Sequence, residues 1–315
     1  MNHWGSAIAP RRVLLVSATD QRFFHLLRGM LTTLSPALPG VDVACFDLGM
    51  SASQREWLGA LPALVAVPRA HMDVVADQHD LALLSFLARP FLREYFPGYD
   101  VYVWVDSDLW FQRPEVLQAY IDGACAEGFA ITHETERAYR FQPRLFAWTS
   151  KHFLLGYGPM TGAWLLSRRH LNAGFFAAHA DAPHWDAWAR HYKAAIARTG
   201  ALVPHDQFAL VQALHARAPS GSRLPTAFLE PTCNWIVDRG VPMWNDAVGA
   251  FCKPYAPYEP IAAVHLAGPG KRRVYTVRRT GGGSFTTRIL PGATPERPAL
   301  ASAEAGAVSV VPAIA

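Results

Sequence analysis

Apolar, β-branched runs alternate with segments of helical periodicity along the first hundred residues of this chain. The runs predict buried strands at residues 12–17, 41–46, 64–67 and 99–105. Apolar side chains at helical spacing lie between these runs, in residues 23–34, 51–58 and 81–95. Strands and helices that alternate at this pace predict βαβ units and a mainly parallel sheet flanked by helices. The expected fold class is therefore α/β.

Two carboxylates, Asp106 and Asp108, follow directly after the strand predicted at 99–105. Acids beside a buried strand are costly to desolvate, and two so close together would repel until one of them was protonated. A divalent cation would keep both ionised and accept their oxygens. Ligands of such sheets bind beyond the carboxyl ends of the strands, where Ser17 and Asp20 also lie after the first strand. The pattern predicts a metal-dependent ligand site at this edge.

The second half of the chain is less regular. It predicts strands at 129–132, 163–166 and 261–265, and helices at 184–197 and 205–216. A hairpin is expected from residues 274–277 and 285–290, with three glycines between them. We expect one domain over residues 11–290, and a disordered tail in the Ala- and Pro-rich residues 291–315.

Composition limits the class of protein. With 51% apolar and 17% charged residues, the 315-residue chain can bury a sizeable core, and its net charge of +4 does not favour a nucleic-acid partner. Its four cysteines are widely spaced, which argues against a zinc knuckle or a disulfide framework. No run reaches the length of a membrane span, and residues 1–10 lack the apolar core of a signal peptide. We expect a cytoplasmic protein.

One basic stretch, residues 271–288, contains no acid. Its cations are Lys271, Arg272, Arg273, Arg278, Arg279 and Arg288. They could contact phosphate or the anionic inner face of a membrane, and a solvated hairpin is an equally good interpretation.

Several short motifs occur in a defined order between residues 12 and 271. They are Arg89, Asp106-Ser107-Asp108, Asn172-Ala173-Gly174, Asp206-Gln207, and His265-Leu266-Ala267-Gly268-Pro269-Gly270-Lys271. In this order they resemble the family-8 glycosyltransferases of GT-A fold, the retaining enzymes related to glycogenin. The resemblance implies a Rossmann-like nucleotide-sugar-binding fold, a UDP-hexose donor such as UDP-glucose or UDP-galactose, and a Mn²⁺ or Mg²⁺ ion. The acceptor, whether glycan, lipid-linked sugar or protein, stays open.

In this resemblance Asp106, Asp108 and His265 hold the metal. A neutral imidazole with carboxylates suits Mn²⁺ better than Ca²⁺. An isolated His265 would be read as a hydrogen-bonded core histidine, but a phosphate-type loop follows it: Gly268 permits close backbone approach, and Lys271 supplies a point charge.

The resemblance assigns a further set of residues to the donor. They are Arg89, Ser107, Asn172, Ala173 and Gly174, which join Ser17 and Asp20 from the strand-end argument. Arg89 could instead form a salt bridge to one of the aspartates. Asn172 could instead be a turn residue before Gly174.

Asp206 and Gln207 are implied to lie beside the anomeric carbon, as the catalytic residues. The alternative for Asp206 is an ordinary helix N-cap. A neutral glutamine amide is a poor nucleophile, which favours retention by front-side attack over a covalent intermediate. An inverting enzyme with Asp206 as base is the other possibility.

Two rival functions are a haloacid-dehalogenase-type phosphatase and a GT-A-like module that binds without transferring. Leu109-Trp110 after the acidic pair, and the position of that pair deep in the chain, argue against the phosphatase. The complete set of metal-ligand candidates argues against the binding module. We expect a solvated loop at His133, Glu134 and Glu136. Trp110, Trp148, Trp185, Trp188 and Trp244 could line an acceptor groove by stacking on sugar rings, but for most of them we expect ordinary packing.

Overall fold

The computed structural model describes residues 11–69, 81–200, 205–216, 221–297 and 299. Its central sheet contains seven strands in the order β3-β2-β1-β4-β7-β6-β8. Their bounds are β1 Val13–Thr19, β2 Val41–Asp47, β3 Leu64–Ala66, β4 Val101–Val105, β6 Phe129–His133, β7 Leu171–His179 and β8 Ala227–Leu229. Within this sheet β7 runs antiparallel to both of its neighbours, and the other pairs are parallel. The predicted mainly parallel α/β sheet is confirmed.

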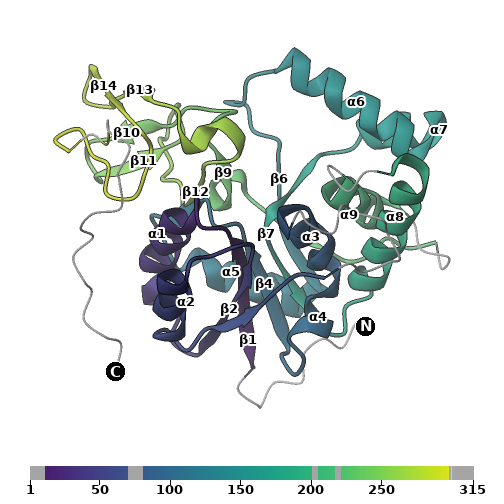
Figure 1. Ribbon diagram of the computed structural model, residues 1–315. Coiled ribbons are helices and arrows are strands. Elements are labelled where there is room, and N and C mark those ends of the chain that lie inside the picture. The colour runs from purple at the N-terminus through teal and green to yellow at the C-terminus, as the bar shows by residue number, and fades with distance from the viewer. Residues whose placement is uncertain (1–10, 70–80, 201–204, 217–220, 298, 300–315) are drawn as a thin grey trace.

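Helices cover both faces of this sheet (Figure 1). One face is covered by α1 Phe24–Leu34, α2 Ala52–Gly59 and α5 Val116–Glu127, and the other by α3 Leu81–Ala88, α4 Leu92–Tyr95, α8 His184–Thr199 and α9 His205–His215. Strand β1 shows why two layers form. Its Val13 and Leu15 enter the first core while Leu14 and Val16 enter the second, as the alternation of side chains along a strand requires.

A smaller sheet of order β5-β12-β9 lies beyond the end of β4. Its strands are β5 Leu109–Phe111, β9 Trp235–Ile236 and β12 Ala263–His265. Two hairpins adjoin it, β10 Met243–Asn245 with β11 Ala250–Cys252 and β13 Tyr275–Arg278 with β14 Ser284–Thr287. Strand β12 pairs antiparallel with β5, so that His265 lies opposite Leu109. This pairing carries the late histidine to the acidic turn after β4.

Short 3₁₀ turns connect several of these elements: η1 Ser35–Ala37, η2 Arg89–Phe91, η3 Pro231–Cys233 and η4 Gly268–Lys271. The helix predicted over 81–95 is broken at Pro90, where η2 separates α3 from α4. The helix predicted over 205–216 and the hairpin after Lys271 are confirmed as α9 and β13–β14.

The strand predicted at 163–166 is wrong. These residues end α7 Pro159–Leu166, which follows α6 Pro143–Tyr157 after the Gly158 turn. A proline in the first turn of each helix supports the helical start, and a four-residue apolar run is too short to distinguish strand from helix. Figure 1 shows α6 and α7 at the outer edge of the molecule, beyond β6 and β7.

The packed body extends past the predicted boundary at residue 290. Ala293 is buried, and the Arg288 backbone N–H donates to the Ala299 carbonyl. Residues 298 and 300–315 of the predicted tail lie outside the described residues. Across the described ranges, none of the helices has both the length and the hydropathy needed to cross a bilayer.

Candidate metal and nucleotide-sugar site

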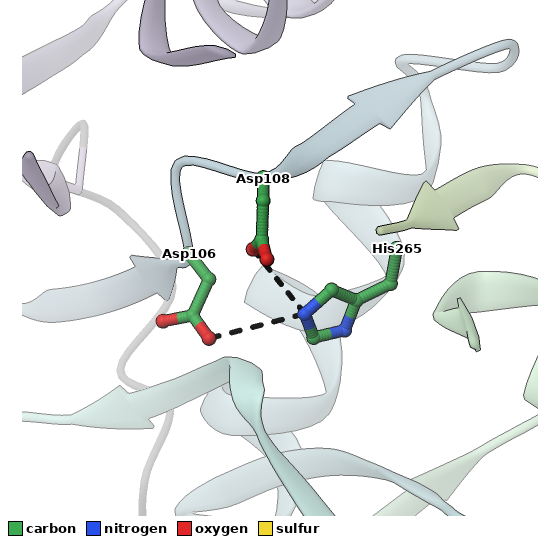
Figure 2. A group of neighbouring side chains, drawn as sticks. All are labelled: Asp106, Asp108 and His265. Atoms are coloured by element: carbon green, nitrogen blue, oxygen red, sulfur yellow. Dashed lines mark ion pairs between the residues drawn. The ribbon is translucent and has the colours of Figure 1, made fainter. Parts of the chain in front are cut away.

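The acidic turn is held in place by the strands on either side of it. Asp106 follows β4, and its backbone N–H donates to the Gly174 carbonyl of β7 at 2.7 Å. The Asp108 carbonyl accepts the Leu266 N–H at 3.0 Å, directly after β12. These contacts place the side chains of Asp106, Asp108 and His265 so that one ligand atom from each lies within 4.8 Å of the others (Figure 2).

Each carboxylate directs one oxygen to the histidine and the other to a cation. His265 Nε2 lies 3.3 Å from Asp108 Oδ1 and 3.9 Å from Asp106 Oδ2. The remaining oxygen of Asp108 pairs with Lys271, and that of Asp106 pairs with Arg89. Metal–ligand bonds of about 2.1 Å place neighbouring ligand atoms about 3–4 Å apart, so these three atoms suit one divalent cation.

The orientation of His265 is fixed from behind by an amide. Its Nδ1 lies 2.9 Å from Asn234 Oδ1, and Asn234 Nδ2 donates to Asn172 Oδ1 at 3.1 Å. That same Asn172 oxygen accepts the Gly174 N–H at 2.9 Å, while Asn172 Nδ2 donates to Glu134 at 2.9 Å. A backbone N–H can only donate and a carboxylate can only accept, so the direction of the chain is set. His265 must donate through Nδ1, which makes Nε2 the ring nitrogen that faces the carboxylates.

Gly174, which has no side chain, lies against His265 and Asp106. A Cβ at this position would lie 2.6 Å from His265 Cε1 and 2.7 Å from Asp106 Oδ2. No other amino acid fits without displacing both ligands. The absence of a side chain at Gly174 thus leaves room beside the metal-ligand candidates, which supports their fit to an ion.

Arg89 bridges two acids that are distant in sequence. Its Nη2 lies 2.7 Å from Asp106 Oδ1 and its Nη1 lies 2.8 Å from Asp206 Oδ2. The guanidinium also lies 4.8 Å from the ring centroid of Trp104, whose indole N–H donates to Asp106. The salt bridge considered for Arg89 therefore forms, to two aspartates at once.

The two buried acids differ in electrostatics. Burial acts to raise the pKa of Asp108, but the nearby His265 and Lys271 outweigh it and hold that pKa well below its usual range. Burial raises the pKa of Asp206 to about 6, against the attraction of Arg89. Asp108 is thus kept ionised, as a metal ligand must be, whereas Asp206 titrates near neutral pH.

A cavity of about 440 Å³ opens in front of these groups. The predicted site residues in its lining are Arg89, Asp106, Asp108, Asn172, Gly174, Asp206, Gln207, His265, Gly268 and Lys271. Ser17, Asp20, Ser107 and Ala173 are not in this lining. The Ser17 hydroxyl donates to the Val105 carbonyl between β1 and β4, and Asp20 pairs with Arg22 beside α1. The strand-end argument places Ser17 and Asp20 at the correct edge but not in the cavity.

Several cavity and supporting residues are missed by the sequence reasoning. Glu134, expected in a solvated loop, has a side chain only 8% exposed and pairs with Arg239 at 3.0 Å. Trp148, one of the tryptophans considered for an acceptor groove, is 42% exposed and lines the cavity together with Leu145 and Thr149 of α6, which carry no sequence signal. Asn234 carries no sequence signal at all, because its role depends on contacts with His265 and Asn172 that only the fold creates.

No protein-family model matches this chain, and no curated protein matches it. Among solved structures the chain is similar to the galactosyltransferase LgtC in complex with donor and acceptor sugar analogues, with TM-score 0.49 and 14% identity over 82% of this chain and 90% of that chain. It is also similar to the apo form of mouse xyloside xylosyltransferase 1, with TM-score 0.47 and 13% identity over 81% and 97% of the two chains. A third similar structure is core-mannan synthase A from Aspergillus fumigatus in its Mn/GDP form, with TM-score 0.42 and 13% identity over 67% and 71%. Identities this low do not carry a substrate or an activity from one protein to another.

Proposed function

We propose that this chain is a metal-dependent glycosyltransferase that moves a hexose from a nucleotide sugar, UDP-glucose or UDP-galactose, to a hydroxyl acceptor with retention. The observation that carries the proposal is the cluster of Asp106, Asp108 and His265 at the wall of a cavity that also contains Lys271 and Arg89. The carboxylates can bind a cation, and the neighbouring basic side chains can bind a diphosphate. A nucleotide sugar and its metal ion together require both kinds of group.

Asp106 Oδ2, Asp108 Oδ1 and His265 Nε2 are the atoms that would hold Mn²⁺ or Mg²⁺. When bound, the ion acts as a Lewis acid towards the diphosphate of the donor. Lys271, 25% exposed in the cavity wall, offers its ammonium to a phosphate oxygen, and Gly268 of the same turn has a positive φ of 58°. The backbone can thus approach the diphosphate closely, where a side chain would be strained.

Asp206 and Arg89 would position the sugar. Asp206 is 5% exposed, and its carboxylate is fixed by Arg89 at the cavity wall, where it can accept hydrogen bonds from hydroxyl groups. Because Arg89 also holds Asp106, the sugar end and the metal end of the donor would be aligned by one side chain.

For a retaining transfer, the contacts of Gln207 bear on the choice between front-side attack and a covalent intermediate. Its Oε1 accepts the Ala173 N–H at 3.1 Å, and its Nε2 lies 3.4 Å from Glu134. A neutral amide oxygen that already accepts a hydrogen bond is a weak nucleophile. This favours front-side displacement, in which the acceptor oxygen bonds to the anomeric carbon, the bond to the diphosphate breaks, and the diphosphate takes the hydroxyl proton. Anomeric analysis of the product by NMR tests this step, and an inverted product would instead indicate Asp206 as base.

Calorimetry of UDP binding with and without Mn²⁺ tests the donor site. Wild type should bind UDP only when the metal is present. Asp108→Asn should not bind UDP measurably even when the metal is added. Asp181→Asn is the matched control, because Asp181 has an 83% exposed side chain remote from the cavity. If no nucleoside diphosphate binds in a metal-dependent way, the catalytic proposal fails. Binding without turnover of any UDP-hexose would favour the non-catalytic binding module.

A further inference from the structure

We propose that the outward face of α6, together with the start of α7, docks on an anionic lipid bilayer. The proposed membrane contact does not depend on the proposed enzymatic activity. The proposal rests on apolar exposure, on charge, and on the position of α6 beside the cavity.

Exposed apolar side chains are concentrated on this part of the molecule. Of the thirteen large apolar residues that are exposed in the described ranges, six fall between residues 141 and 160. They are Phe141 (73% exposed), Phe146 (53%), Trp148 (42%), Leu154 (41%), Leu155 (57%) and Met160 (87%). Scattered apolar residues need no explanation, but a cluster of this kind marks a surface that is covered by a partner.

The charge of the same segment has one sign. Residues 137–180 contain six Lys and Arg residues and no Asp or Glu. Arg144 and Lys151 of α6 are exposed, and neither has an ion-pair partner among the residues that the structure describes. Arg144 and Lys151 therefore give the exposed side of α6 a positive charge that suits an anionic partner.

Cations and apolar groups share one face of the helix. Arg144, Trp148, Lys151 and Leu155 are spaced three or four residues apart, which places them along one side of α6, and all four are exposed. The opposite side is buried in the core through Phe153 and Tyr157. On this face the long basic side chains can reach lipid headgroups while the neighbouring Trp148 and Leu155 contact the region below them.

Two other partners fit less well. A second copy of this chain would bring two acid-free, positive surfaces together, so that like charges would repel. An acidic protein would satisfy the cations but would not account for side chains as exposed as Met160. A bilayer surface satisfies both groups, since long basic side chains reach the headgroups while the apolar side chains enter below them.

The basic stretch 271–288, for which a membrane contact is also conceivable, is less available. Arg273 pairs with Asp238, Arg279 pairs with Asp246 at 2.6 Å, and Arg288 donates to the Lys271 carbonyl at 2.6 Å. Lys271 pairs with Asp108, so four of the six cations are used within the fold, in contrast to those on α6.

The docked face borders the site. Leu145, Trp148 and Thr149 of α6 line the cavity that contains Asp106 and Asp108. A bilayer on the outward face of this helix would lie next to the cavity opening. An acceptor anchored in the membrane is the substrate class that this arrangement favours, an extension that rests on the proposed function.

Co-sedimentation with vesicles tests the docking. The full chain, without donor or metal, is mixed with vesicles of equal parts phosphatidylcholine and phosphatidylglycerol, and separately with phosphatidylcholine alone. Wild type should bind the anionic vesicles, and less so as salt is raised. Lys151→Glu should reduce the partition coefficient about tenfold or more, because one cation is lost and one anion is gained at the surface. Leu155→Asp should reduce binding comparably.

Val248→Asp is the matched control, because Val248 is 56% exposed between β10 and β11, remote from α6. It should bind as wild type does. Absence of binding to anionic vesicles, or binding that neither α6 variant weakens, would overturn the proposal. Light scattering is measured in parallel, and a dimer abolished by Leu155→Asp would also overturn it, in favour of self-association. Because vesicle binding and UDP binding are separate measurements, either proposal can fail while the other stands.

Discussion

Asn234 accepts the Nδ1 proton of His265 across 2.9 Å, and so determines which imidazole nitrogen is free to bind a cation. Asn234 is fully buried, and its own orientation is set by Asn172. We therefore expect Asn234→Ala to weaken Mn²⁺ affinity by about 10–100-fold, although Asn234 touches no ligand atom of the metal. Asn234→Asp keeps the acceptor oxygen for His265 but places a second acceptor against Asn172 Oδ1, so it should restore only part of the affinity. Titration of Mn²⁺ by electron paramagnetic resonance measures this directly, and equal affinities for all three proteins would contradict the role given to Asn234.

Gly174→Ala should abolish metal binding while the fold is kept. The added methyl would lie 2.6 Å from His265 Cε1, which is closer than carbon atoms approach in folded proteins, so a ligand must move. Gly59→Ala is the control, because a Cβ there would meet nothing within 4 Å. Circular dichroism should be unchanged in both variants. Intact Mn²⁺ binding in Gly174→Ala would show that the space beside His265 is not needed.

Arg89→Met should destabilise the fold by about 3–5 kcal/mol, since it leaves Asp106 and Asp206 without their buried partner. Arg22→Met removes an exposed partner of Asp20, and should change the free energy of unfolding by less than about 1 kcal/mol. Urea unfolding in the presence of a chelator compares the two. Similar small losses in both variants would mean that the Arg89 bridge contributes little to stability.

The raised pKa of Asp206 predicts a pH dependence of stability. Because the folded state holds the Asp206 proton up to about pH 6 whereas the unfolded chain releases it near 3.8, protonated Asp206 favours folding. This contribution is fully present below the unfolded value and is lost as pH rises through about 6. Asp206→Asn cannot lose a proton, so its stability relative to wild type should increase between pH 4 and pH 7. Urea unfolding of both proteins over this range, again with a chelator, checks the sign, and parallel curves would refute it.

The sequence was sufficient for the parts of the site that local pattern determines. The apolar run before Asp106 predicts a strand end, and the motif order then brings in His265 and Lys271, which the fold does place beside the acids. The same strand-end rule fails to put Ser17 in the cavity, because its hydroxyl group donates a hydrogen bond to the Val105 carbonyl between β1 and β4. Which polar group at a strand end faces the ligand is decided by neighbouring strands.

Residues 143–166 show a different limit. Helix α6 carries apolar residues such as Leu155 on its exposed side, which usually carries polar ones, so the sequence does not mark a helix at 143–157. The apolar run at 163–166 was predicted as a strand, although it ends α7. The roles of Asn234 and Glu134 could not be predicted from the sequence for another reason. They depend on contacts with His265 and Arg239, which are distant along the chain.

The pairing of β12 between β5 and β9 also has a consequence for the order of synthesis. Asp106 and Asp108 leave the ribosome long before His265 and Lys271, which arrive on β12 and η4. Until then the growing chain carries the two acids with neither their histidine nor their lysine. A nascent chain should therefore have no complete set of the three ligand candidates until His265 has emerged.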